Sequence, residues 1–261
     1  MLNTIDTILR EAGRIILREK DPEIMQKEGH ANFVTQADRD VQDFLFDKLT
    51  ALMPESAFYG EEQENAPLTD APTWVVDPID GTTNFIRGLH HSAISVALSV
   101  EKRLSLSAVY NPYRDEMFLA KAGEGAMLNG KRIRCADTPF EFAVVAFGSS
   151  LYDPSLVART MKACGDFMLK SGDLRRFGSA ALDLAYVACG RVDVFFEYSL
   201  SPWDYAAGML LVREAGGRVE LLNLPGELLD FSKTAAVFAA SATCFDPALP
   251  IVKSAYAPKE G

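Results

Sequence analysis

The hydrophobic pattern changes its period near residue 140, and this change limits the folds that the chain can adopt. Between residues 92 and 134 apolar residues alternate with polar ones, and Asn129-Gly130 favours a type I′ hairpin turn. This segment predicts an antiparallel meander. From the apolar run Phe142–Phe147 onward, short strand patterns alternate with helical patterns. That alternation predicts a mostly parallel sheet with helices on both faces.

Helical spacing marks the beginning of the chain, and glycine and proline mark helix ends further on. Apolar residues from Leu2 to Ile16 predict an amphipathic helix, and a second helix is expected from about Asp38 until Pro54 stops it. In the second half, we expect one helix from Asp153-Pro154 to Gly165 and a last helix after Asp246-Pro247.

No repeat, low-complexity tract or flexible linker divides the 261 residues. We therefore predict a single domain over residues 1–261. Its N-terminal α+β half covers about residues 1–138, and its C-terminal α/β half covers about residues 139–261.

Charge and cysteine content restrict the partners and the compartment. The net charge of −10 disfavours nucleic acid and anionic membrane surfaces, which require basic clusters. Charged residues interrupt the apolar pattern of the first 20 residues, which argues against a secretory signal. The four cysteines are far apart without a CxxC pair, which is typical of reduced thiols, so we expect a cytoplasmic protein.

Carboxylates concentrate where predicted elements end. The stretch "WVVDPIDGTTNF" places Asp77 and Asp80 after a buried strand, Glu61 and Glu62 follow Gly60, and Asp204 lies in "SPWDYAAG". Clustered carboxylates repel one another unless a cation joins them, and Mg²⁺ prefers such oxygen ligands. Each cluster by itself is also compatible with an ordinary turn or a solvated surface. Their combination predicts a magnesium site.

Small donor-rich residues follow the aspartates. Backbone N–H groups beside Gly81 and the hydroxyl of Thr82 can hold phosphate oxygens. Two magnesium ions can stabilise the attacking and leaving oxygens of a phosphoryl displacement. The residues themselves thus favour metal-dependent phosphate chemistry.

Three segments resemble the signatures of one known family. "WVVDPIDGTTNF", "SPWDYAAGMLLVREAGG" and the earlier "GEE" of residues 60–62 are similar to those of the inositol monophosphatase family, the Mg²⁺-dependent, lithium-sensitive phosphatases. The resemblance extends from the first helices at least to the second signature. It implies a layered αβαβα sandwich of the inositol monophosphatase and fructose bisphosphatase type, and a homodimer.

The resemblance also implies a metal site with two to three Mg²⁺ ions. Glu61, Asp77 and the carbonyl of Ile79 would bind the first ion, and Asp77, Asp80 and Asp204 the second. Asp38 would support a third ion through water. Glu61 and Thr82 would activate the attacking water, and Lys27 would belong to a gating loop. The implied substrate contacts are Asp80, Gly81, Thr82, Gly178, Ser179, Ala180, Glu197 and Asp204.

The substrate is less narrowly defined than the chemistry. The resemblance implies inositol monophosphate as the leading expectation, because Glu197 lies seven residues before Asp204, as in the family members that act on inositol phosphates. However, "NFIRGLHH" departs from the family pattern, and its Arg87 could engage a second anionic group or remain a surface residue. Fructose 1,6-bisphosphate, histidinol phosphate and 3′-phosphoadenosine phosphates are therefore alternatives. A non-catalytic, metal-binding interaction protein is a further alternative from another functional class.

Overall fold

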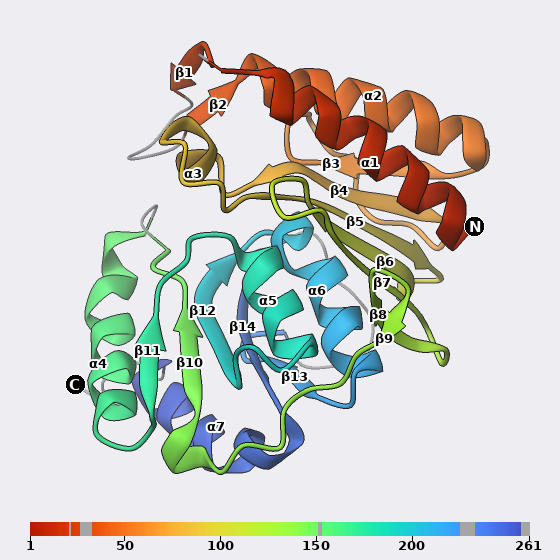
Figure 1. Ribbon diagram of the computed structural model, residues 1–261. Coiled ribbons are helices and arrows are strands. Elements are labelled where there is room, and N and C mark those ends of the chain that lie inside the picture. Colours follow the sequence, from red (N-terminus) through yellow and green to blue (C-terminus); the bar gives the residue numbers. More distant parts are fainter. Residues whose placement is uncertain (21, 27–32, 151–152, 225–232, 257–261) are drawn as a thin grey trace.

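The computed structural model describes residues 1–20, 22–26, 33–150, 153–224 and 233–256. Its elements form layers in which helices and sheets alternate (Figure 1). Helices α1 and α2 cover the outer face of one sheet, α5 and α6 lie between that sheet and a second one, and α4 and α7 cover the far face of the second sheet. The layered αβαβα class predicted from the sequence is thus confirmed.

The helices form where apolar residues repeat along one face. In α1, for example, Ile5, Leu9, Ala12 and Ile16 are completely or almost completely buried. The α-helices are α1 (Leu2–Arg18), α2 (Gln36–Leu52), α3 (Thr82–Ile86), α4 (Val157–Met168), α5 (Ala180–Ala188), α6 (Pro202–Glu214) and α7 (Ala242–Tyr256), with 3₁₀ turns at Phe140–Phe142 and Pro154–Leu156.

The first large sheet has seven strands in the order β3-β4-β5-β6-β7-β8-β9. Its strands are antiparallel except for the parallel pair β3 and β4. Positive φ angles of 48° at Asn129 and 74° at Gly130 confirm the predicted turn. The strands are β3 (Ala57–Gly60), β4 (Thr73–Asp80), β5 (Ala93–Val100), β6 (Arg103–Asn111), β7 (Glu116–Lys121), β8 (Gly125–Leu128) and β9 (Lys131–Arg132).

The second sheet has five strands in the order β11-β10-β12-β14-β13, and it is mixed. The mostly parallel arrangement predicted from the sequence holds for β10 with β11 and β12, whereas β14 is antiparallel to both neighbours. The reason is that β14 turns back from β13 and inserts between β13 and β12. The strands are β10 (Val144–Phe147), β11 (Asp173–Arg175), β12 (Val194–Leu200), β13 (Arg218–Leu221) and β14 (Ala235–Ala240); a separate pair consists of β1 (Ile24–Gln26) and β2 (Phe33–Thr35).

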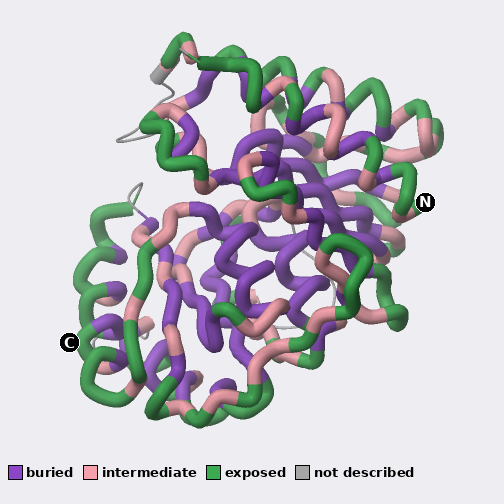
Figure 2. The backbone as a smooth tube through the Cα atoms, in the orientation of Figure 1, coloured by how far each residue is buried: buried purple, intermediate pink, exposed green. Residues whose placement is uncertain are grey.

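Buried residues gather between the layers (Figure 2). The cluster between the two sheets contains residues from both predicted halves, for example Val75 and Phe118 with Leu184 and Met209. The two halves therefore share one core, and the single domain over residues 1–261 stays a prediction. None of the helices in the described part of the chain has the length and apolar character needed to cross a bilayer.

Two predicted helix ends are wrong. Gly165 lies inside α4, which continues to Met168 because Phe167 still packs into the core. Helix α7 begins at Ala242, before Asp246-Pro247, and contains Pro247. Burial of Phe245 against Phe238 of β14, with ring centroids 4.9 Å apart, favours this early start although the proline cannot donate a helical hydrogen bond.

Candidate active site

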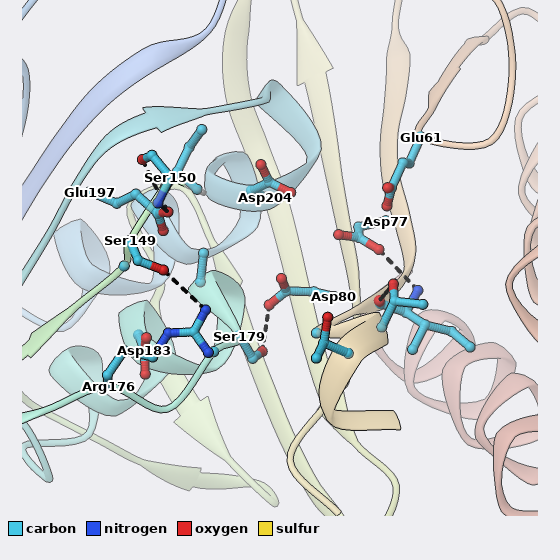
Figure 3. Close-up of a pocket in the computed structure, with 18 of the residues that line it drawn as sticks. Glu61, Asp77, Asp80, Ser149, Ser150, Arg176, Ser179, Asp183, Glu197 and Asp204 are labelled. Atoms are coloured by element: carbon cyan, nitrogen blue, oxygen red, sulfur yellow. Dashed lines mark hydrogen bonds between the residues drawn. The ribbon is translucent and has the colours of Figure 1, made fainter. Parts of the chain in front are cut away.

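A cavity of about 140 Å³ opens where β4, α3, α5, α6 and β12 meet (Figure 3). The structure brings all predicted site residues to its lining except Asp38, which is buried beside it. Lys27 lies outside the described residues. The predicted residues in the lining are Glu61, Asp77, Ile79, Asp80, Gly81, Thr82, Gly178, Ser179, Ala180, Glu197 and Asp204.

Strand register places Glu61 beside Asp77. Strands β3 and β4 are parallel, and Gly60 pairs with Val76. The next residue on each strand therefore emerges at the same edge of the sheet. The amide of Glu61 donates to the carbonyl of Val76 at 3.2 Å, which extends this pairing to the site.

A register shift brings Asp77 and Asp80 together. In a regular strand, residues three apart point to opposite faces. Here, Asp77 pairs with Ser95 and Asp80 with Ala93, so three steps on β4 oppose two on β5. This irregularity turns both carboxylates toward the cavity. The carboxylate of Asp77 also accepts a hydrogen bond from the amide of Ile79 at 2.9 Å, which fixes the bend.

Asp204 and Asp38 are both held by helix capping. In α6, Asp204 Oδ2 accepts from the amide of Ser201 at 2.7 Å. In α2, Asp38 Oδ2 accepts from the amide of Thr35 at 2.7 Å. Each aspartate occupies the third position of its helix in a capping box, so its orientation is set by the helix start.

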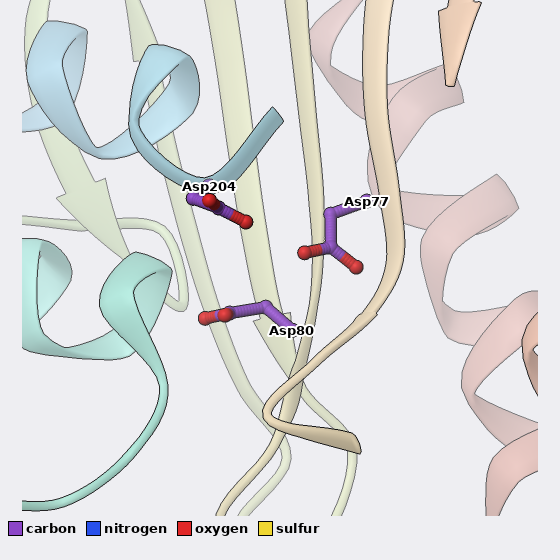
Figure 4. A group of neighbouring side chains, drawn as sticks. All are labelled: Asp77, Asp80 and Asp204. Atoms are coloured by element: carbon purple, nitrogen blue, oxygen red, sulfur yellow. The ribbon is translucent and has the colours of Figure 1, made fainter. Parts of the chain in front are cut away.

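Asp77, Asp80 and Asp204 form the centre of the site (Figure 4). Each offers a carboxylate oxygen, and these oxygens lie within 4.8 Å of one another. Burial and the nearby Glu61 raise the pKa of Asp77 well above its usual range, and burial raises the pKa of Asp80 to about 6. Burial, together with Asp80 and Glu61, also raises the pKa of Asp204. Hard oxygen donors whose mutual repulsion is uncompensated fit a divalent cation such as Mg²⁺.

The turn after Asp80 is tightly packed. Gly81 has a φ of 91°, and a Cβ there would lie 3.0 Å from the carbonyl oxygen of Gly178. The position therefore requires glycine. The hydroxyl of Thr82 lies 3.2 Å from the carbonyl oxygen of Ile79 and 3.4 Å from Asp38 Oδ1. These contacts place the hydroxyl between the carbonyl of Ile79 and the carboxylate of Asp38.

Ser179 contacts Asp80 from the opposite half of the chain. Its hydroxyl donates to Asp80 Oδ2, and the amide of Ala181 donates to the same oxygen at 2.7 Å. These bonds to the ionised carboxylate oppose the effect of burial on the pKa of Asp80. The hydroxyl of Ser179 thus orients one of the three clustered carboxylates.

Glu197 lies on the side of the cavity away from Asp77. Its Oε1 accepts from the amide of Ser150 at 2.8 Å and from the hydroxyl of Ser150 at 3.2 Å. Burial raises the pKa of Glu197 to about 7, with the two bonds from Ser150 acting against it. A fixed carboxylate in this position can accept hydrogen bonds from a substrate hydroxyl.

Other residues of the site escaped the sequence reasoning. Arg176 also lines the cavity, and its Nη2 donates to Ser149 Oγ at 3.2 Å. Asp183 lines it as well, and burial raises its pKa well above the usual range. By contrast, Arg87 is exposed and lies outside this cavity. The pair of arginines immediately before "FGSAA" was the available signal for Arg176.

Comparisons with known proteins agree with this geometry. The sequence profile described as "Inositol monophosphatase family" matches residues 1–246. The chain is 41% identical over 224 residues to the Nus factor SuhB of Escherichia coli (strain K12), covering 84% of each chain. It is 40% identical over 223 residues to the inositol-1-monophosphatase of Rhizobium meliloti (strain 1021), covering 83% of this chain and 84% of that protein. An IMPase structure from Thermotoga maritima superposes with a TM-score of 0.87 at 31% identity, over 97% of each chain. The chain belongs to the inositol monophosphatase family.

Proposed function

We propose that this protein is a Mg²⁺-dependent phosphomonoesterase that hydrolyses inositol monophosphate to inositol and phosphate. The observation that carries the proposal is the close approach of Asp77, Asp80 and Asp204 oxygens, within 4.8 Å, next to the turn at Gly81 and Thr82. The name of the Rhizobium relative supports the choice of substrate.

Glu61, Asp77, Asp80, Asp204 and the carbonyl of Ile79 would hold two Mg²⁺ ions, and Asp38 would support a third. When bound, Mg²⁺ lowers the pKa of a coordinated water and neutralises phosphate charge. Glu61 and Thr82 would orient the attacking water, and the carboxylate of Glu61 would take up its proton. The turn at Gly81 and Thr82 holds the phosphate oxygens, which fixes phosphorus in line with the attack.

The alcohol part of the substrate would lie toward Glu197 and Ser179. Glu197 is held by Ser150 and can accept hydrogen bonds from vicinal hydroxyls of a polyol. Gly178 and Ala180 border the same space and leave room for a ring. This arrangement favours a cyclic polyol phosphate over a simple alkyl phosphate.

One observation favours a bisphosphate as a second candidate. Arg176 is the only cationic side chain in the described lining of the cavity, and it lies among carboxylates on the Glu197 side. An arginine there can bind a second phosphate group bidentately. For such a substrate, Arg176→Ala should lower kcat/KM for fructose 1,6-bisphosphate much more than for inositol monophosphate.

The test is phosphate release from inositol monophosphate, fructose 1,6-bisphosphate, histidinol phosphate and 3′-phosphoadenosine 5′-phosphate, with Mg²⁺ and with chelator. We expect Mg²⁺-dependent turnover that is fastest on inositol monophosphate and inhibited by Li⁺. If only another ester is hydrolysed, that ester replaces inositol monophosphate as the proposed substrate, and the proposed Mg²⁺-dependent chemistry stands. Mg²⁺ binding without hydrolysis of any ester would instead support the non-catalytic role.

A homodimer and a cytoplasmic location stay predictions for this chain. Light scattering after size-exclusion chromatography would measure the oligomeric state directly. The expected absence of nucleic-acid binding, based on the net charge of −10, can be measured with fluorescent RNA at low salt.

A further inference from the structure

Asn84 is a buried polar residue that the proposed mechanism does not use. It lies on α3, two residues after Thr82, and only 3% of its surface is exposed. Its side-chain amide Nδ2 donates to the carbonyl oxygens of His91 at 2.7 Å and Phe177 at 2.8 Å, and lies 3.3 Å from that of Gly178. One amide group thus serves three carbonyl groups.

These carbonyl groups come from segments far apart in the chain. His91 lies between α3 and β5, in the N-terminal half, whereas Phe177 and Gly178 lie between β11 and α5, in the C-terminal half. Asn84 therefore joins the segment that carries Asp80 and Thr82 to the segment that carries Ser179. Without Asn84, three converging carbonyl oxygens would lose this donor and would repel one another.

The contact continues to a metal-binding carboxylate. Directly after Gly178, the hydroxyl of Ser179 and the amide of Ala181 donate to Asp80 Oδ2. The carbonyl oxygens of Gly178 and His91 also form the wall behind Gly81, at 3.0 and 3.2 Å from an ideal Cβ there. A shift of this wall would therefore move both the donors to Asp80 and the turn that precedes Thr82.

We propose that Asn84 is a positioning residue of the active site: by holding the segment of Phe177 and Gly178 against α3, it sets the orientation of Asp80 for metal binding. This inference rests on the proposed metal-dependent function. It assigns a role to the asparagine of "DGTTNF" that requires no contact with substrate or metal.

The experiment compares Asn84→Ala and the isosteric Asn84→Asp with Asn223→Ala. Asn223 is the control: its side chain is exposed but also bridges two backbone groups, donating to Thr234 and accepting from Ala236, away from the cavity. Mg²⁺ affinity is measured by calorimetry, Mn²⁺ affinity by electron paramagnetic resonance, and stability by thermal unfolding.

We expect both Asn84 variants to weaken Mg²⁺ and Mn²⁺ binding about tenfold or more, as is typical when the support of a metal ligand is lost. Asn223→Ala should retain wild-type metal affinity, even if its unfolding temperature falls by as much as that of the Asn84 variants. Turnover by the Asn84 variants should require correspondingly higher Mg²⁺.

Metal affinity within twofold of wild type in Asn84→Ala, together with a lower unfolding temperature, would overturn the proposal. If Asn84→Ala and Asn84→Asp do not fold, Asn84→Ser takes their place, because its single hydroxyl cannot serve all three carbonyl groups. If wild-type protein binds metal but hydrolyses no ester, the proposed phosphatase function is wrong. The role of Asn84 is then decided by the metal affinities of the variants alone. Wild-type protein that binds neither Mg²⁺ nor Mn²⁺ overturns both.

Discussion

The carboxylate of Glu197 occupies the space that any side chain at Gly148 would need. An ideal Cβ at Gly148 would lie 1.7 Å from Glu197 Oε2. Gly148 directly follows β10, and Glu197 lies on the neighbouring strand β12. The amide of Gly148 donates to the carbonyl of Phe196 at 3.0 Å. Backbone pairing therefore holds Gly148 in place. The Glu197 carboxylate can occupy its position only because Gly148 has no side chain.

Gly148→Ala should displace Glu197 and raise KM for inositol monophosphate about tenfold, because overpacking of a buried site typically costs about 1–3 kcal/mol. Mg²⁺ affinity should stay unchanged, since Asp77, Asp80 and Asp204 are not displaced. Steady-state kinetics and calorimetry measure the two effects. Gly165→Ala is the control: among the described residues, no atom beyond its chain neighbours and its own helix backbone lies within 4 Å of its ideal Cβ, so activity should persist. An unaltered KM in Gly148→Ala would contradict a substrate contact by Glu197.

Asp77→Asn should reduce Mg²⁺-dependent turnover on the order of 10²-fold or more, because it would remove the ligand proposed to be shared by two ions. The metal-free variant should nevertheless unfold at a higher temperature than metal-free wild type. The neutral side chain relieves repulsion from Glu61, Asp80 and Asp204, and its oxygen can still accept from the amide of Ile79. Turnover assays and calorimetric unfolding with chelator test both statements; turnover near the wild-type rate would rule out the metal assignment.

The metal-free protein should lose stability as pH rises from about 5 to about 7.5. Burial raises the pKa of Asp80 to about 6 and that of Glu197 to about 7, so the folded state binds more protons than the unfolded state in this range. The free energy of unfolding then falls with increasing pH, and one pKa unit corresponds to about 1.4 kcal/mol.

Thermal unfolding across this pH range, with and without Mg²⁺, measures the effect. Mg²⁺ should restore stability most strongly at the upper end, where the carboxylates are ionised. Glu197→Gln removes one titrating group and should flatten the metal-free profile. A metal-free profile that rises over the same range would show that the buried carboxylates do not control it.

Thr82→Val should lower kcat about 10²-fold with little loss of stability, because it removes the hydroxyl but preserves the shape of the side chain. That hydroxyl lies within reach of Ile79 O and Asp38 Oδ1. Thr82→Ser should retain most activity. The neighbouring Thr83→Val is a matched control, since Thr83 lines the cavity and is exposed. Equal losses in Thr82→Val and Thr83→Val would argue against a specific role of the Thr82 hydroxyl.

Much of this protein could be predicted from its sequence because the deciding interactions are local. Apolar residues that repeat at strand or helix spacing predicted the strands and helices that form the layers. The backbone preferences of Asn129-Gly130 predicted a turn. Asp38 and Asp204 are capping residues. The four residues of each capping box determine where the helix starts and how the aspartate is oriented. The resemblance to the family signatures implied the proposed metal ligands as a set.

Only the tertiary structure decided how these pieces meet. Asp77 and Asp80 would point to opposite faces of a regular strand, and it is the shifted pairing with β5 that turns them to one side. The direction of β14 depends on where it inserts beside β12, which no local pattern specifies. Gly148, Arg176 and Asn84 contact residues distant in the chain. The contacts of Gly148 with Glu197 and of Arg176 with Ser149 form within the folded C-terminal half, and that of Asn84 with Phe177 forms only when the two halves pack together.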